Sequence, residues 1–431
     1  MGLPKADSSY FFNGHLFGEY INVKKFKEDI KNKTSLKFEE NIDLPSLYQY
    51  IVQTKPGFKS VVDKILFENI LYSYLKNVFV NNISLNPPLT SDLFKQKMKH
   101  LIEELNYTKD IPSNFYAEMK EDGFYLMDAL NITVPRAKFI AGFDIEEENE
   151  IVKNLRLLFV EVVLREGKPV YFIAGVDIDF TNRIALVLIR NLQGISKTVS
   201  DSDEEFDNTV NRLYHRVLDS VFKKLGIGLE KIDVDRDREG MYKFCKELDD
   251  ALLNDIREEV KSKTESVVAD SVKKLNKVLF PNENRLNNAD KKDLSEKIQS
   301  LLLSYYINYN VKADELVMKA KELNLVGYPT KVKFMDTNST KSSTQSGNSK
   351  QPVSAIEAFH SLYFNFKQAL ELENWSISWF TDYEFKNARD LDVIQTTIYS
   401  TRNSFRVVFL PTRPLNKEIV HHVIRTINSY R

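Results

Sequence analysis

Apolar residues recur every three or four positions in several long stretches of the chain, which is the period of an amphipathic helix. Residues 58–80 carry a broad apolar face and predict one such helix. Residues 93–105 predict a second helix. These patterns indicate that residues 1–135 form a mainly helical N-terminal region.

The pattern changes in the next part of the chain, where three runs are rich in β-branched and aromatic residues. The runs are 155–164, 169–179 and 184–190, and short polar links separate them. Such spacing is typical of an antiparallel meander. The middle run is apolar without alternation, so we expect a central strand that is buried on both faces.

Helical periodicity returns after the meander. An apolar stripe predicts a helix over 203–226, and a charged stretch predicts a long helix over 239–279. Two further helices are predicted over 294–309 and 313–323, and together these segments favour a helical hairpin or bundle. The sequence therefore predicts that 136–335 combines an antiparallel meander with long helices.

Residues 336–352 contain no large apolar side chain to anchor them in a core, and we expect a flexible polar linker there. Residues 353–431 then read as a small α+β module. Its predicted elements are a helix over 353–372, strands near 375–381, 393–400 and 404–410, and a helix over 415–429. The predicted fold is a multi-domain α+β fold, with a helical N-terminal region, a small mainly antiparallel sheet, a helical segment and a tethered C-terminal module.

Length and composition limit the class of protein. The chain has 431 residues, which is too long for one compact core. Its 60 Lys and Arg residues nearly balance 61 Asp and Glu residues, which excludes a histone-like basic protein. A single Cys excludes a disulfide scaffold and a Cys-rich zinc module. The chain lacks the P-loop, dinucleotide-binding, GxSxG and HExxH motifs, so the common enzymes that carry them are not expected.

No run approaches the roughly 18 apolar residues that cross a bilayer, and no apolar signal core opens the sequence. We therefore expect a soluble cytoplasmic protein without a membrane partner. High Lys, Asn, Ile, Phe and Tyr contents suggest an AT-rich genome.

A set of carboxylates accompanies the predicted meander. Asp177 and Asp179 end the central run, and a period of two places them on the same strand face. Glu161 lies on the neighbouring run, and Asp237 belongs to a later acidic cluster. Mg²⁺ and Mn²⁺ prefer oxygen ligands, and two-metal phosphodiester cleavage needs several converging carboxylates. These four residues are the catalytic candidates, and Asp177 and Asp237 are the candidate metal ligands.

An acid on a central strand, a hairpin and a later acid resemble the general layout of RNase-H-like nucleases, the PIWI domain included. The resemblance covers only a few residues and implies a nuclease that depends on Mg²⁺ or Mn²⁺. The same acids also suit a strand end, where Asp favours turns, and the start of a helix, where acids complement the helix dipole. This structural interpretation is the favoured one, and it requires no cofactor.

The C-terminal 46 residues are basic, with eight Lys and Arg residues against three acids. Lys417, His421 and Arg425 are spaced four apart and share one face of the predicted last helix. Clustered bases beside aromatic residues can follow a phosphate backbone and stack on bases. The candidate nucleic-acid contacts are Arg402, Arg406, Lys417, His421 and Arg425. A solvated basic helix face, whose bases complement the helix dipole, is the favoured interpretation of this pattern.

The stretch 239–279 also has apolar residues three or four apart, close to a coiled-coil seam. Packing within the chain is the favoured interpretation, and a protein partner or self-association is the alternative. The leading hypothesis is a non-catalytic adaptor or sensor in a nucleic-acid-related assembly, of mobile-element or phage-defence type. The alternatives are the metal-dependent nuclease and a structural oligomerisation protein.

Overall fold

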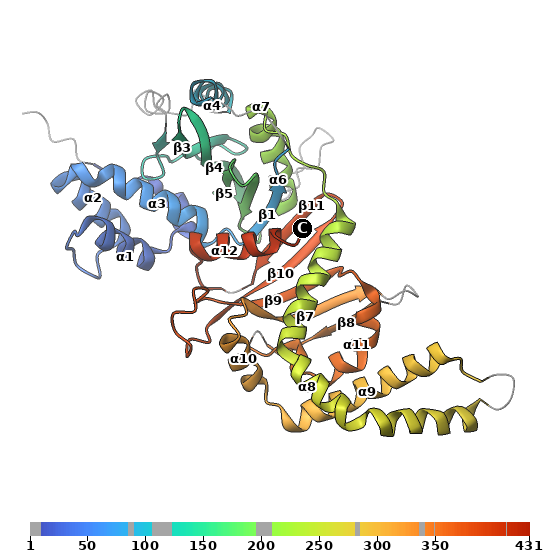
Figure 1. Cartoon of the computed structure of the whole chain (residues 1–431). Coiled ribbons are helices and arrows are strands. Elements are labelled where there is room, and N and C mark those ends of the chain that lie inside the picture. Colours follow the sequence, from blue (N-terminus) through green and yellow to red (C-terminus); the bar gives the residue numbers. More distant parts are fainter. Residues whose placement is uncertain are drawn as a thin grey trace, which may run out of the picture. The chain divides into compact units, whose positions relative to one another are not determined.

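The computed structural model describes residues 10–84, 90–105, 123–194, 209–280, 285–335, 341–348, 350–410 and 412–431. It confirms the predicted multi-domain α+β class, with helices and antiparallel strands in both parts of the chain (Figure 1). The chain divides into two compact units. The first unit contains Met1–Lys231 and Thr412–Val420, and the second contains Ile232–Pro411 and His421–Arg431.

An antiparallel sheet with the strand order β2-β3-β4-β5-β6-β1 forms the centre of the first unit. The strands are β1 (Asn77–Asn82), β2 (Phe124–Tyr125), β3 (Lys138–Glu148), β4 (Ile151–Arg165), β5 (Lys168–Asp179) and β6 (Ile184–Ile189). The predicted meander is confirmed, because β4, β5 and β6 pair in sequence order. The central β5 is buried from Tyr171 to Ile178, as its continuous apolar run predicted.

Helices pack on both faces of this sheet. They are α1 (Val23–Thr34), α2 (Leu44–Thr54), α3 (Lys59–Ser73), α4 (Ser91–Leu105), α6 (Val210–Val217) and α7 (Lys223–Leu225), with short helical turns at Gly14–Tyr20, Pro56–Phe58 and Leu218–Phe222. Leu71 of α3 lies so close to β5 that a Cβ at Gly175 would meet its Cδ1 at 2.2 Å. Tyr214 of α6 stacks on Phe79 of β1, with ring centroids 4.1 Å apart.

One prediction for the first unit is wrong in part, and one long strand was not predicted. The helix predicted over 58–80 ends at Ser73, and Val78, Phe79 and Val80 lie in β1. These residues pair with β6, where tertiary packing overrides the helical period of the preceding turns. The sequence analysis also missed β3, because its polar end at 146–148 hides the strand pattern.

The helix predicted over 203–226 is present from Val210 to Leu225, with a π-helical turn at Leu218–Phe222 in its middle. It ends at Gly226 with a φ of 72°, a left-handed conformation that glycine adopts at low cost. Residues 203–208 of that prediction lie outside the described residues.

The five strands of the second unit pair antiparallel in the order β11-β10-β9-β7-β8, and we call this part of the strand order the second sheet. The strands are β7 (Gly327–Met335), β8 (Lys341–Gln345), β9 (Asn374–Phe380), β10 (Val393–Thr401) and β11 (Ser404–Phe409). The helices are α8 (Val234–Leu279), α9 (Asn288–Asn310), α10 (Ala313–Glu322), α11 (Glu357–Ala369) and α12 (Lys417–Asn428), whose first residues belong to the first unit. The predicted helical hairpin is formed by α8 and α9 (Figure 1).

The flexible linker predicted over 336–352 is wrong for residues 341–345. They form β8, which pairs with β7 from Lys331↔Gln345 to Met335↔Lys341. A strand at the edge of a sheet is held by its backbone hydrogen bonds and needs few apolar side chains, so composition alone did not reveal it. Residues 336–340 lie outside the described part of the chain. The second unit includes residues on both sides of this segment, so 353–410 is not a separate body from 232–335.

The core of the second unit centres on β9, whose Trp375 and Trp379 are fully buried. Phe244 of α8 contacts both indoles, with ring centroids 5.3 and 5.9 Å away. It also stacks on Tyr430, the residue before the last one, with ring centroids 4.5 Å apart. Gly240, one turn earlier in α8, provides the space for this contact.

Gly240→Ala should destabilise the protein by about 1–3 kcal/mol, although Ala is the better helix former. A Cβ at this position would lie 2.1 Å from the backbone carbonyl oxygen of Tyr430, which cannot rotate away as a side chain would. Urea denaturation of the full chain measures the change. Gly18→Ala is the control, because an added Cβ there meets nothing within 4 Å. Equal stabilities of the two variants would contradict the predicted clash.

Candidate functional site

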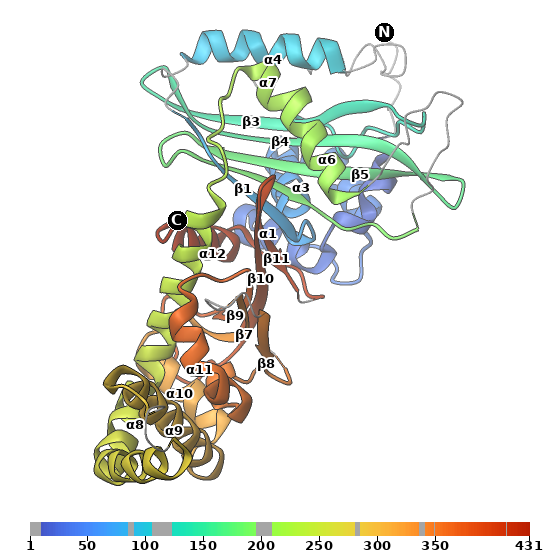
Figure 2. The ribbon, with the colours of Figure 1, turned by 90° about the vertical axis from the view of Figure 1, so that its right-hand side faces the viewer.

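The two faces of the second sheet have different chemistry. On one face Trp375, Trp379 and Ile398 are buried, and α8 and α11 lie on a common side of the strands in Figure 2. The register places the opposite residues of the same strands on the other face, which we call the polar face. Its side chains are those of Lys331, Lys333, Ser376, Ser378, Gln395, Thr397, Tyr399 and Arg406.

The strands that form the polar face contain no acidic residue. Across the five strands of the second unit there is no Asp or Glu, while Lys331, Lys333, Lys341 and Arg406 are cationic. Glu373, which precedes β9, binds Lys333 at 2.9 Å and Lys341 at 3.2 Å. The hydrogen bond from Lys333, assisted by Lys341, lowers the pKa of the Glu373 carboxyl. Lys331 has no ion-pair partner among the described residues, so the face keeps a net positive charge.

The centre of the polar face is a hydrogen-bonded layer of small polar side chains. The hydroxyl oxygens of Ser376 and Thr397 lie 2.9 Å apart across β9 and β10. Gln395 crosses over β9 and donates from Nε2 to Oγ1 of Thr330 at 2.7 Å. Hydrogen bonds between neighbours hold these groups in place, and Ser376, Ser378 and Thr397 are buried, so this layer orders the polar face without itself being open to solvent.

One aromatic ring on the polar face contacts a cationic side chain. Tyr399 of β10 lies opposite Arg406 of β11, and the guanidinium carbon is 5.1 Å from the ring centroid. Partial burial lowers the pKa of Arg406, although a guanidinium stays protonated at any physiological pH. A ring and a guanidinium in contact present two flat groups on which a planar ligand can stack.

The structure separates the predicted basic residues. Arg406 lies on the polar face, and Arg402 lies exposed in the turn between β10 and β11. His421 and Arg425 are on α12, whose His422 contacts Trp379 on the opposite face of the sheet. Lys417 is on the same helix, in the part that belongs to the first unit. The predicted patch is therefore not one continuous surface within the second unit.

Two cations of β7 on the polar face, Lys331 and Lys333, were not among the residues predicted from the sequence. A period-two alternation could have revealed them, because Lys331 and Lys333 alternate with Val332 and Phe334 in β7. Ser376 and Ser378 alternate with apolar residues in the same way in β9.

The four carboxylates predicted as catalytic do not converge. Asp177 accepts a hydrogen bond from the Tyr72 hydroxyl at 2.7 Å, on the α3 side of the first sheet. Glu161 lies on the other face of that sheet. It pairs with Phe172, which is five residues before Asp177, and residues an odd number of positions apart on a strand point to opposite faces. It binds Nη1 of Arg216 at 2.6 Å, and burial raises the pKa of its carboxyl.

Asp179 and Asp237 also have structural partners. Asp179 caps the turn after β5 by accepting a hydrogen bond from the backbone N–H of Asn182 at 2.8 Å. Asp237 belongs to the second unit, where it binds Nε of Arg431 at 2.9 Å and accepts from Ser400 at 3.0 Å. In the described part of the chain, no group of three or more His, Cys, Asp and Glu residues is placed to hold a metal ion.

Comparisons with known proteins give no relative for this chain: no family model, no curated protein and no solved structure matches it. Among the described residues, no helix has both the length and the apolar content needed to cross a membrane.

A buried pair of carboxylates in the first unit shares one lysine. Asp63 of α3 and Asp128 both bind Nζ of Lys59, at 2.7 and 3.2 Å. Tyr10 donates a hydrogen bond to Asp128, and Tyr48 lies nearby. Burial, with a second contribution from the charge of Asp128, raises the pKa of Asp63 to about 7.

Asp63 should make the free energy of unfolding depend on pH. Its pKa is about 7 in the folded protein and about 3.9 when unfolded, so the folded state holds more protons between these values. Stability should fall as pH rises from about 4 to about 7, by up to about 1.4 kcal/mol per pH unit from this residue. Asp63→Asn should remove that contribution from the slope, and denaturation at several pH values measures it. Asp29→Asn on α1 is the control, and identical slopes in both variants would exclude the mechanism.

Proposed function

We propose that this chain is a non-catalytic nucleic-acid-binding protein, and that the polar face of the second sheet is its contact surface. The observation that carries the proposal is the absence of acidic residues from all five strands, which together carry four cations. In a chain whose formal net charge is −1, this is a marked separation of charge. A polyanion is the ligand whose electrostatics match such a surface.

The chemistry of the polar face suits a single strand better than a duplex. Lys331 and Lys341 would neutralise phosphates and release counterions. Tyr399 and Arg406 provide flat groups for an unstacked base, and the partly exposed Gln395 amide can bond to a base edge. A flat sheet can contact several successive nucleotides in this way.

The proposal extends to the setting of the protein. A cytoplasmic location agrees with the single Cys, which is buried and unpaired. A role as adaptor or sensor in a mobile-element or phage-defence assembly would agree with the composition typical of an AT-rich genome. The α8–α9 hairpin would be available for a protein partner in such an assembly.

Lys331→Glu combined with Lys341→Glu should weaken binding of a single-stranded oligonucleotide by at least about tenfold at low salt. It should also reduce the slope of log affinity against log salt concentration by about 2, because two phosphate contacts are lost. Fluorescence anisotropy with labelled single- and double-stranded DNA and RNA at several salt concentrations measures both. Both lysines lie at partly or fully exposed positions, so the fold should be retained, and circular dichroism checks this.

The matched control is the pair Lys417→Glu and Arg425→Glu on α12, which reverses the same number of charges. This pair should change the affinity far less. If it abolishes binding while the β7–β8 pair leaves it unchanged, the basic helix is the contact surface and the polar face is not. If Mg²⁺ produces cleavage that Asp177→Ala removes, the nuclease alternative replaces the proposal.

A further inference from the structure

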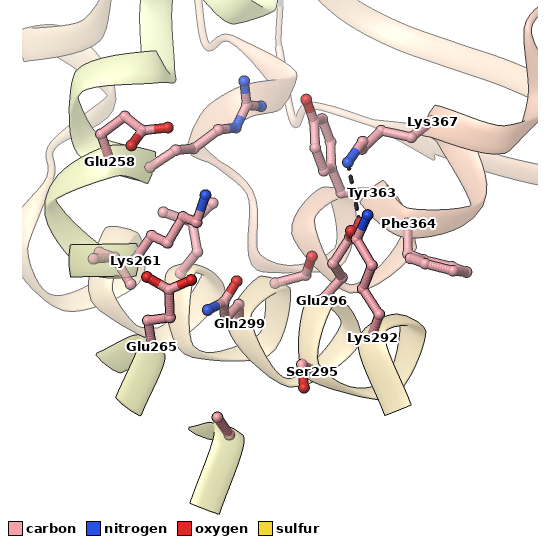
Figure 3. Close-up of a pocket in the computed structure, with 15 residues that line it drawn as sticks. Glu258, Lys261, Glu265, Lys292, Ser295, Glu296, Gln299, Tyr363, Phe364 and Lys367 are labelled. Carbon is pink, nitrogen blue, oxygen red and sulfur yellow. Dashed lines mark hydrogen bonds and ion pairs between the residues drawn. The ribbon is translucent and has the colours of Figure 1, made fainter. Parts of the chain in front are cut away.

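A cavity of about 490 Å³ lies within the second unit, between α8, α9 and α11 (Figure 3). Its size falls in the range of about 300–1,000 Å³ that is usual for small-molecule sites. Its chemistry differs from that of the polar face. Both acidic and basic side chains line it, together with the apolar residues Val260, Leu303 and Phe364.

One end of the cavity is fixed by a buried charge network. The guanidinium of Arg257 lies over the ring of Tyr363, 4.2 Å from its centroid. Arg257 also binds Asp250 at 2.9 Å and Asp249, and Asp249 accepts a hydrogen bond from Ser354 at 2.7 Å. This end is therefore rigid, and its positive charge is already neutralised by the protein.

The two long walls carry opposite net charges. The α8 wall has two carboxylates and one ammonium group, while the wall from α9 and α11 has two ammonium groups and one carboxylate. Figure 3 shows these side chains on the two sides of the cavity. They are Glu258, Lys261 and Glu265 on α8, and Lys292, Glu296 and Lys367 on the facing wall.

Only part of this charge is paired among the described residues, and the unpaired groups there, Lys292, Glu258 and Glu265, are exposed to solvent. Lys367 binds Glu296 at 3.2 Å, which leaves Lys292 as the available cation of its wall. In the part of the chain that the structure describes, Lys292, Glu258 and Glu265 have no ion-pair partner. A ligand that carries an anion at one end and a cation at the other would match both walls, because each end would face the opposite charge.

We propose that this cavity binds a short peptide with free termini. Its carboxylate would face Lys292, its terminal ammonium group would face Glu265, and an apolar side chain would lie on Val260, Leu303 and Phe364. Gln299 and Ser295, which also line the cavity, can bond to peptide groups between the two ends. The site is independent of the polar face and of nucleic acid.

The test is calorimetric titration of the full chain with a panel of tripeptides that carry Leu, Phe, Tyr or Val at the central position. Each peptide is used with free termini, with an acetylated amino terminus and with an amidated carboxyl terminus. We expect at least one free peptide to bind, and each blocking group to weaken it by at least tenfold. The proposal is overturned if no peptide of the panel binds, or if the blocked peptides bind as tightly as the free ones.

Two variants assign the ends of the peptide. In Lys292→Gln, amidating the peptide should no longer weaken binding, because the partner of the carboxylate is gone. In Glu265→Gln, acetylating it should no longer matter. Lys291→Gln, on the same helix but outside the cavity lining, is the control and should behave as the unmodified protein. If both blocking effects persist unchanged in the two variants, the peptide binds elsewhere and the assignment is wrong.

Discussion

The second unit depends on the alternation of side chains along β9, its central strand. Trp375 and Trp379 point to one face and pack on α8, while Ser376 and Ser378 point to the other. A shift of one residue would place the hydroxyls against α8 and turn both indoles toward the polar face, so this alternation specifies a single register. The same register places Lys331 and Lys333 of β7, and Tyr399 of β10, on the face with the serines. The polar face therefore follows from the packing of the hydrophobic core on the other side of the sheet.

In the first unit, the charged residues of the central strands are held in ion pairs. Its central strands are buried on both faces, so the charged residues they contain must be paired. Arg156 shows this, since it binds both oxygens of Asp144, at 2.8 and 2.6 Å, and Glu68 at 2.9 Å. Carboxylates that are bound in such ion pairs stabilise the sheet and are not free to ligate a metal. For this reason the acids of the meander, which the sequence suggests as catalytic candidates, are bound to structural partners in the fold.

The two candidate sites of the second unit illustrate two kinds of complementarity. The polar face is broad and carries one sign of charge, which attracts a polyanion but selects weakly among its sequences. The cavity is lined by α8, α9 and α11 and carries both signs of charge, which would select a small ligand by the positions of its charges. Arg257 does not contribute a free charge to the cavity, because Asp249 and Asp250 already hold it. Its contribution is rigidity, since it fixes Tyr363 beside the ligand space.

The sequence by itself determined the elements whose stability is local or whose pattern is strong. The α+β class, the meander, the long helices and the three strands after residue 372 are of this kind, because hydrophobic periodicity and turn residues act over a few positions. Tertiary structure decided the rest. Pairing with β6 turned 77–82 into a strand, and pairing with β7 ordered 341–345 despite their polar composition. It also decided which residues share a surface: Lys331 and Arg406 are 75 positions apart in the chain and lie on one face, while Glu161 and Asp177 are close in the chain and lie on opposite faces. Such neighbourhoods depend on strand order and register, which long-range burial selects and local sequence patterns do not encode.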